Sequence, residues 1–359
     1  MKTLNVIQII DSLNAGGAEV LAVNIANELS EQKIQSHLCT TRAEGILKKN
    51  INKEVGFIFL ERKKVVDFKA IFKLNSYIKK NNIRIAHAHA TSAFIAVCVK
   101  ILNPALKIIW HDHFGDSEFL NKRNSLWLKL FSYFFSTIIS VNQNLKKWSI
   151  DKLHTKKVFF IRNFPVFTNR ERTTELKGVK NKRIIHLAGY REQKDHLNLL
   201  KAFQILSKNH NDWTLHLVGR SYNDSYSDSI NTFIENNKLT DKVFQYGVCS
   251  DIEYILSQST IGVLSSKSEG LPICLLEYGL AKLPAVVTNV GECNLVIKDS
   301  NFIVPPSNSI ILAKALTSLV NSEEKRKKLT LEINNTIKLN FSKEEAVLKI
   351  ISIYKSSAK

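Results

Sequence analysis

The sequence alternates short runs of β-branched and aliphatic residues with longer amphipathic stretches over nearly all of its 359 residues. Runs of about four to eight such residues are typical of buried strands, whereas apolar residues three and four positions apart are typical of helices. A repeated strand–helix–strand order favours parallel sheets with helices on both faces. The strands expected in the first half are residues 5–10, 36–40, 56–59, 83–87, 107–110, 137–141 and 158–161.

The same order begins again near residue 183, after a polar segment at 168–182 without apolar periodicity. We therefore predict an α/β protein with two doubly wound, Rossmann-like domains at 1–167 and 183–340. The segment 168–182 is the expected linker, and a helix in 341–359 is expected to pack back across the domains. Such sheets bind ligands at the carboxyl ends of their strands, so we expect the domains to face a central cleft. The strands expected in the second domain are residues 183–188, 213–218, 243–246, 261–264 and 285–288.

The net charge of +19 is concentrated in the first domain. Residues 1–167 hold 25 Lys and Arg against 12 Asp and Glu, and residues 168–359 hold 26 against 20. This excess favours an anionic partner such as lipid headgroups or a phosphate-linked acceptor, although a solvated lysine-rich surface explains it equally well. No helix-turn-helix, RNA-recognition or zinc-finger pattern is present, so we expect no nucleic-acid partner.

Targeting and redox signals are weak. The five cysteines are scattered without a C-x-x-C pair, which argues against a disulfide framework and fits a reducing compartment. The apolar stretch 126–141 is shorter than the ~20 residues of a spanning helix. We expect a cytoplasmic protein, with peripheral contact at the inner face of the plasma membrane. Lys122, Arg123 and Lys129 beside the aromatic residues of 127–135 suit an interfacial helix, and a core helix is the alternative.

Two consecutive glycines, Gly16 and Gly17, follow the first expected strand and open a helix. Glycine lets the backbone approach a bound group closely, and the free N–H groups of a helix N-terminus bind phosphate. The spacing is not that of the dinucleotide-binding G-x-G-x-x-G pattern. A plain tight turn is therefore the alternative interpretation.

A basic loop with Arg191 and Lys194 follows the first strand of the second domain and leads into a helix. A diphosphate leaving group would be held at such a place. An exposed basic loop without a ligand is the alternative.

The segment 268–273 (SEGLPI) forms a turn between a strand and a helix, and it carries Glu269, with Glu277 eight positions further on. Carboxylate oxygens accept hydrogen bonds from sugar hydroxyls. Glu277 lies in a helix of small and apolar residues, where a buried carboxylate without a partner is costly. A structural salt bridge is the alternative for this glutamate.

Four histidines stand at the ends of two neighbouring strands, His87 and His89 on one and His111 and His113 on the other. His-x-His pairs bind metals, so a metal-dependent hydrolase is a competing hypothesis. No D-x-D pair, the usual carboxylate clamp for a nucleotide-bound divalent ion, occurs in the chain.

Together these motifs resemble glycosyltransferase family 4, a group of retaining enzymes with the GT-B fold of two facing Rossmann-like domains. The resemblance covers most of the chain. The Gly-Arg pair that is usual in this family aligns with Ala188-Gly189 in this sequence. The family's phosphate-binding arginine is therefore absent, and Arg191 is the candidate substitute. The segments that carry it are Gly16-Gly17-Ala18-Glu19, Trp110-His111-Asp112, Ser140-Val141-Asn142, Asn163, Glu269 to Glu277 and Val287-Thr288-Asn289-Val290-Gly291.

The resemblance implies a retaining, metal-independent transfer from a nucleotide-diphosphate sugar, with UDP favoured, to a glycan or lipid-linked acceptor in cell-surface polysaccharide synthesis. It implies no cofactor. Catalytic roles fall on His111, Lys194 and Glu269. A sugar-nucleotide epimerase or hydrolase, and a membrane- or nucleic-acid-binding protein without catalysis, stay as alternatives. The residues implied in donor binding are Gly16, Gly17, Arg191, Val248, Ser250, Gly270, Leu271, Pro272, Ile273 and Glu277.

Overall fold

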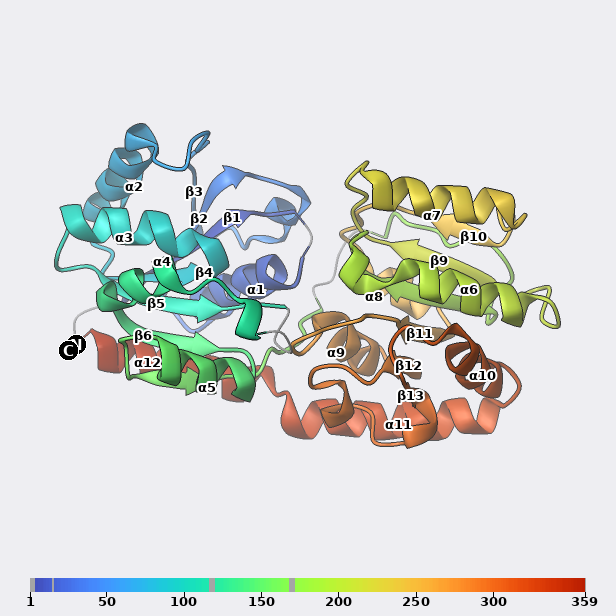
Figure 1. Cartoon of the computed structure of the whole chain (residues 1–359). Coiled ribbons are helices and arrows are strands. Elements are labelled where there is room, and N and C mark those ends of the chain that lie inside the picture. The colour runs from blue at the N-terminus through green and yellow to red at the C-terminus, as the bar shows by residue number, and fades with distance from the viewer. Residues whose placement is uncertain (1–3, 15, 116–119, 168–171, 359) are drawn as a thin grey trace. The chain divides into compact units, whose positions relative to one another are not determined.

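The computed structural model describes residues 4–14, 16–115, 120–167 and 172–358. The chain forms two compact units (Figure 1). The first unit comprises Met1–Phe164 with Lys343–Lys359, and the second comprises Pro165–Ser342. Each unit is built around one parallel sheet with helices on both faces.

The sheet of the first unit has seven parallel strands in the order β3-β2-β1-β4-β5-β6-β7. Its strands are β1 Asn5–Ser12, β2 Gln35–Ala43, β3 Gly56–Phe59, β4 Ile85–His89, β5 Lys107–Asp112, β6 Phe135–Ser140 and β7 Val158–Phe160. Its helices are α1 Gly17–Glu31, α2 Phe68–Lys80, α3 Ala93–Leu102, α4 Leu126–Phe131, α5 Gln143–Lys152 and α12 Lys343–Ser357.

Strand β1 is apolar on both faces because both faces are covered. Ile7 and Ile9 pack into one core cluster, and Ile10 packs into a second with Leu13. A strand buried on both sides reads as a continuous apolar run rather than an alternating one. That is the pattern from which this strand was predicted.

The C-terminal helix α12 belongs to the first unit. Its Tyr354 is fully buried and contacts Gln8 and His87 through its hydroxyl, at 3.2 Å and 2.6 Å. Lys343 at its start forms an ion pair of 2.9 Å with Glu28 of α1. The chain therefore returns to its first sheet after completing the second one.

The second unit has six parallel strands in the order β10-β9-β8-β11-β12-β13. The strand order reverses between the adjacent strands β8 and β11, as in doubly wound nucleotide-binding sheets. Its strands are β8 Arg183–Leu187, β9 Thr214–Val218, β10 Val243–Gln245, β11 Ile261–Leu264, β12 Ala285–Thr288 and β13 Ile303–Val304. Its helices are α6 His196–Ser207, α7 Ser225–Asn236, α8 Ile252–Ser257, α9 Ile273–Leu280, α10 Ser309–Val320 and α11 Glu323–Asn340.

The two doubly wound sheets confirm the predicted fold class. Part of the expected linker is held on the second unit, because the backbone N–H groups of Thr173 and Thr174 donate to the Asp251 carboxylate at 2.9 Å and 2.8 Å. The linker residues 168–171 lie outside the described part of the chain. Among the helices that the structure describes, none combines the length and the apolar character needed to cross a membrane.

Candidate active site

The strand-order reversal of the second unit brings two loops side by side. Residues 188–195 follow β8, and residues 265–272 follow β11. The Ser265 hydroxyl donates to the Lys194 carbonyl at 2.9 Å, and the Gln193 amide donates to the Ser268 carbonyl at 2.8 Å. A crevice at this position is where open α/β sheets bind their ligands.

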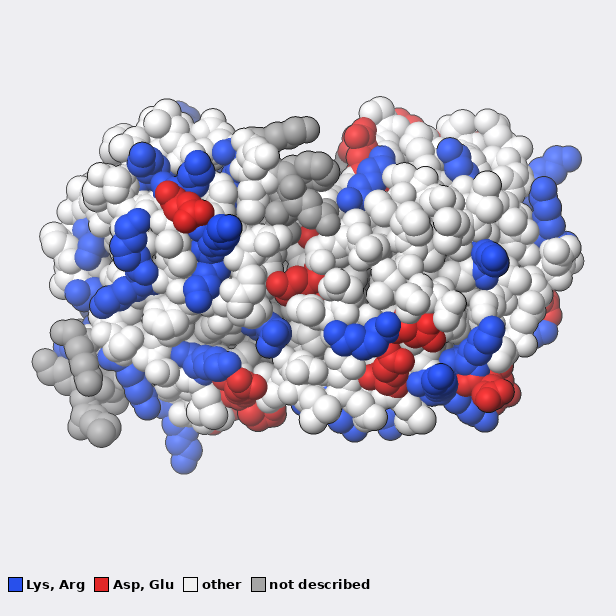
Figure 2. Space-filling view, turned by 60° about the horizontal axis from the view of Figure 1, so that its bottom comes forward, with Lys and Arg blue, Asp and Glu red and all other residues white. Residues whose placement is uncertain are grey.

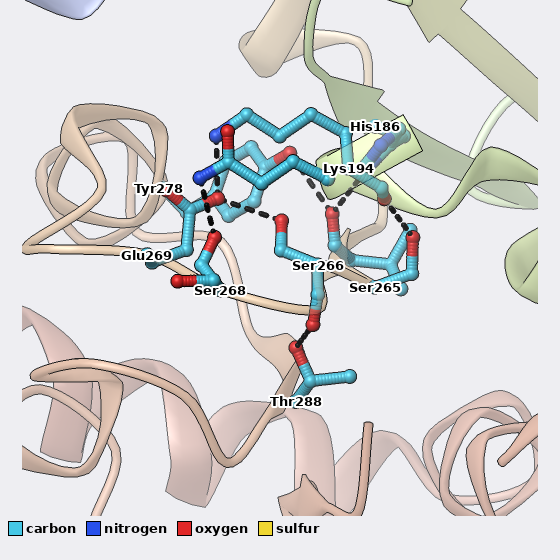
Figure 3. A network of polar contacts seen from close by, with 10 residues as sticks. His186, Lys194, Ser265, Ser266, Ser268, Glu269, Tyr278 and Thr288 are labelled. Carbon is cyan, nitrogen blue, oxygen red and sulfur yellow. Dashed lines mark hydrogen bonds and ion pairs between the residues drawn. The ribbon is translucent and has the colours of Figure 1, made fainter. Parts of the chain in front are cut away.

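Lys194 and Glu269 form an ion pair between these loops (Figure 3). Lys194 Nζ lies 2.5 Å from Glu269 Oε1, and the Ser266 hydroxyl donates to the same oxygen at 2.6 Å. The side chains are 21% and 6% exposed. Burial lowers the pKa of Lys194, but the Glu269 carboxylate more than compensates, so that this pKa stands above its ordinary value. Lys194 is therefore a fixed positive charge at neutral pH.

The loop that carries Glu269 is supported from behind by the loop after β12. Thr288 Oγ1 donates to the Ser266 carbonyl at 2.7 Å (Figure 3), and Glu292 N donates to the Gly270 carbonyl at 2.8 Å. Gly291 has φ +54°, and a Cβ there would lie 2.3 Å from the Gly270 carbonyl oxygen. Only glycine permits this close approach without strain.

Glu277 lies in α9, the helix that follows the Glu269 loop. Its side chain is half-buried, and in the described part of the chain no hydrogen bond or ion pair reaches its carboxylate. Desolvation raises the pKa of Glu277 to about 7. Pro272 is the N-cap of this helix and gives no side-chain hydrogen bond, but its carbonyl accepts a hydrogen bond from Leu275 N at 3.2 Å. The predicted residues Gly270 and Leu271 complete this turn.

The other predicted donor-binding residues of the second unit lie in neighbouring loops. Arg191 follows β8 and donates two hydrogen bonds to the Tyr222 hydroxyl, at 2.8 Å and 3.2 Å. Val248 and Ser250 are half-buried in the loop between β10 and α8. All of these loops follow the carboxyl ends of strands of the same sheet.

Gly16 and Gly17 lie in the first unit, at the start of α1. Gly16 is the N-cap in an extended conformation, and Gly17 is the first helical residue. A Cβ on Gly16 would lie 2.4 Å from a carboxylate oxygen of Glu19. Glu19 thus folds back over the helix start, where its negative charge interacts favourably with the helix dipole.

His111 lies in β5, in a stack of histidines in the first unit. It pairs in register with His89 of β4, and its ring is nearly parallel to that of His87, at 8° and 5.1 Å between centroids. Burial holds the pKa of His111 well below its usual value, with a contribution from His113, so the ring is neutral. Both ring nitrogens of His111 lack a hydrogen-bond partner among the described residues.

The same cluster contains the residues that could hold a metal ion. Ring nitrogens of His87, His89 and His111 lie within 4.8 Å of one another. Their ring planes make angles of 8° to 31° with one another.

Arg123 is not a surface residue, contrary to the interpretation of 122–135 as an interfacial helix flanked by basic residues. Its guanidinium forms two hydrogen bonds to Asp112, at 2.7 Å and 2.8 Å, and lies over the rings of Phe114 and Trp148. Its side chain is 7% exposed because this buried carboxylate pairs with it. The side chain of Lys122 lies outside the described part of the structure.

The sequence did not reveal the polar network around the histidines. Gln8 Oε1 accepts a hydrogen bond from His89 Nε2 at 2.9 Å, and the Tyr354 hydroxyl contacts both Gln8 and His87. The only signal for Gln8 was a single polar residue in an otherwise apolar strand. Tyr354 is distant in the sequence and lies in a helix whose packing partner was not predictable from its own pattern.

Two Rossmann-like sheets, with a partly buried lysine–glutamate pair where the strand order of the second sheet reverses, are typical of the nucleotide-binding α/β class. Residues 15–164 match Glycosyltransferase Family 4, and residues 167–335 match glycosyl transferases group 1. The chain belongs to this glycosyltransferase family, and its fold is GT-B. The family predicted from the motifs is confirmed.

Several known proteins are similar over most of the chain. An uncharacterized glycosyltransferase of Haemophilus influenzae is 23% identical over 95% of this chain and 96% of its own length. The UDP-Gal:alpha-D-GlcNAc-diphosphoundecaprenol alpha-1,3-galactosyltransferase of Escherichia coli is 23% identical over 66% of this chain and 65% of its own length. The structure of Anabaena HepE in complex with UDP and glucose has a TM-score of 0.80 at 15% identity, with 98% and 99% of the two chains covered.

Proposed function

We propose that this glycosyltransferase retains anomeric configuration, needs no metal ion, and moves a sugar from a UDP-sugar to a glycan or lipid-linked acceptor in cell-surface polysaccharide synthesis. Two relatives support the donor and the acceptor. The Escherichia coli enzyme is named for UDP-Gal and a diphosphoundecaprenol acceptor, and HepE was solved in complex with UDP-glucose. An O-antigen biosynthesis glycosyltransferase, 22% identical over 84% of this chain, supports the pathway.

The observation that carries the proposal is the Lys194–Glu269 pair at the strand-order reversal, beside the helix of Glu277, whose carboxylate has no partner among the described residues. Lys194 supplies a fixed positive charge for the departing diphosphate, which a metal ion supplies in other transferases. Glu277 is suited to accept hydrogen bonds from the ribose hydroxyls. Glu269 and the backbone of 270–273 hold the donor sugar, and the loop of Val248 and Ser250 meets the base.

In the proposed reaction the bond between the anomeric carbon and the phosphate oxygen breaks, and the acceptor oxygen bonds to the same face of the carbon. The acceptor proton passes to the departing phosphate oxygen. We assign His111 to a donor-sugar hydroxyl, because both nitrogens of its buried, neutral ring lack a partner among the described residues, and such a ring can both donate and accept a hydrogen bond. The backbone of Gly16 and Gly17 is assigned to the donor phosphates.

We also assign a peripheral membrane contact to the first unit. In α4 and the turn after it, Trp127, Leu130 and Tyr133 are 64%, 47% and 65% exposed. Exposed aromatic residues together with a basic surface favour the interface of an anionic bilayer. On the face in Figure 2, basic side chains predominate over acidic ones across the first unit.

The test is the release of UDP from UDP-glucose, UDP-galactose and UDP-N-acetylglucosamine, with and without undecaprenyl-diphosphate-linked N-acetylglucosamine. The proposal predicts release that depends on the acceptor, an α-linked product, and full activity in EDTA. UDP release that never needs an acceptor would instead support the hydrolase or epimerase alternative. Loss of activity in EDTA would contradict the metal-independent mechanism.

A further inference from the structure

The loops after β8 and β9 run side by side beyond the ends of their strands. Ala188 N donates to the Val218 carbonyl at 2.9 Å, and Tyr190 N donates to the Arg220 carbonyl at 2.8 Å. The pairing of the two strands thus continues into the loop that holds Arg191. Arg220 is an exposed residue in this continuation, next to Gly189.

Gly189 has no side chain, and the space beside it is bordered by the β9 loop. A Cβ built on Gly189 would have its nearest neighbours at 3.7 Å, namely the Arg220 carbonyl oxygen and two atoms of the Tyr222 ring and hydroxyl. The loop after β9 is therefore in contact with the position that the Cβ atom of a residue 189 side chain would take. A cation from this loop can serve the same region of the site.

Two guanidinium groups lie near the ring of Tyr222. The Cζ atoms of Arg191 and Arg220 lie 5.3 Å and 5.1 Å from the centroid of its ring. Guanidinium groups stack on aromatic faces through cation–π attraction. In the part of the chain that the structure describes, neither arginine forms an ion pair. Two like charges gathered without an acidic partner favour a bound anion.

The charge of Lys194 alone does not match a diphosphate, because Glu269 already compensates it at 2.5 Å. A nucleoside diphosphate carries at least two negative charges, and a site without a metal ion must meet them with side chains and helix termini. Arginine forms paired hydrogen bonds to phosphate oxygens more readily than lysine.

We propose that Arg220, held over Tyr222 beside Arg191, binds the diphosphate of the nucleotide donor and takes the role that an arginine at position 189 would have. This inference rests on the proposed function, since it assumes a nucleoside diphosphate donor. Arg220 would then bind the donor from the loop after β9, in place of an arginine in the loop after β8.

The test measures the dissociation constants of UDP and of uridine for the full chain by ligand-observed NMR titration. Arg220→Ala is expected to weaken UDP binding by about tenfold to hundredfold, because a charge-assisted hydrogen bond is lost. It is expected to leave uridine binding unchanged. Lys201→Ala, an exposed lysine of α6, is the control with the same change of net charge, and it is expected to change neither constant. Thermal unfolding confirms that each variant folds.

A rescue variant separates the charge from the loop that carries it. Because the neighbours of a Cβ at position 189 lie at ordinary contact distance, adding Gly189→Arg to Arg220→Ala is expected to restore UDP binding at least about tenfold. No recovery, unchanged UDP binding in Arg220→Ala, or an equal loss for uridine would overturn the inference. Wild-type protein that binds no UDP would overturn the proposed donor as well.

Discussion

Glu277 lies in helix α9, in surroundings that disfavour the ionised form of its carboxyl group. Desolvation raises the pKa of Glu277 to about 7, above the ordinary value of 4.5. Between these values the folded state binds more protons than the unfolded state, so the stability of the protein falls as the pH rises through this window. The carboxylate that we propose for the ribose hydroxyls is thus formed at a cost in stability to the protein without its donor.

We expect Glu277→Gln to raise the unfolding midpoint by about 2 °C at pH 8 and to change it little at pH 5, because the amide never ionises. In the wild type, the dissociation constant of UDP-glucose should rise about eightfold from pH 7.5 to pH 6, as Glu277 becomes protonated. In the variant it should be weaker throughout and independent of pH. Differential scanning fluorimetry and calorimetric titration measure both effects. An unchanged pH dependence in the variant would remove Glu277 from the donor site.

The Lys194–Glu269 pair allows stability and catalysis to be separated. Lys194→Met leaves a carboxylate that is only 6% exposed without its cation, so we expect a loss of about 3 kcal/mol in the free energy of unfolding. Adding Glu269→Leu should recover most of that stability. Sugar transfer should fall at least about hundredfold in both variants, because the charge that we assign to the leaving group is gone. Recovery of transfer in the double variant would show that the pair is structural.

The sequence predicted the position of Lys194 and Glu269 after two strands of the second sheet, and the structure places both there, while their roles stay predictions. It missed residues whose role depends on a neighbouring loop. Arg220 and Tyr222 follow β9 in an exposed stretch without any pattern of its own. Arg123 was misjudged because its partner Asp112 lies eleven positions away on a different element, and local composition does not reveal that contact.

Among the elements, strands bounded by sharp turns were predicted best. The expected strands at 56–59, 261–264 and 285–288 coincide with β3, β11 and β12. Strand β13 has only two residues, and such a run carries no periodicity. The helices α10 and α11 after it were likewise not anticipated. The partner of helix α12 could not be predicted, because an amphipathic pattern identifies the buried face but not what covers it.

Helix α12 should stabilise the first unit through Tyr354. Tyr354→Phe removes a hydroxyl that contacts the fully buried Gln8 and His87, so we expect a loss of about 1–3 kcal/mol in the free energy of unfolding. Tyr133→Phe is the control, since Tyr133 is 65% exposed, and it should be neutral. Urea denaturation measures both variants. Equal stability of Tyr354→Phe and wild type would show that the hydroxyl contributes nothing.

Helix α4 is the element that we assign to the membrane contact. Trp127→Ser should reduce binding to vesicles of phosphatidylglycerol and phosphatidylethanolamine at least about fivefold. This corresponds to about 1 kcal/mol of binding free energy, which is lost because the tryptophan no longer inserts into the bilayer interface. Leu331→Ser in α11 removes an apolar side chain with 65% exposure from the other unit and should have no effect. Co-sedimentation at low and high salt measures both. Equal binding to neutral phosphatidylcholine vesicles would contradict an anionic surface as the partner.

For the whole molecule, we assign the nucleotide of the donor to the second unit, further donor contacts to Gly16, Gly17 and His111 of the first unit, and the acceptor and membrane contacts also to the first unit. The second unit carries the Lys194–Glu269 pair, Glu277 and the two arginines that stack on Tyr222. The excess positive charge is greater in residues 1–167, which fits an acceptor with a diphosphate group. The second unit alone should therefore determine which nucleotide is selected.

The most direct measurement is the thermal unfolding midpoint of the full chain with UDP-, GDP-, ADP- and TDP-glucose. A ligand that binds only the folded state stabilises it by mass action, by about 2.7 kcal/mol at one hundred times its dissociation constant. We expect the midpoint to rise with UDP-glucose, to change little with the other three nucleotide sugars, and not to rise with UDP-glucose in Lys194→Ala. A rise with another nucleotide sugar and none with UDP-glucose, or an equal rise in the variant, would contradict this expectation.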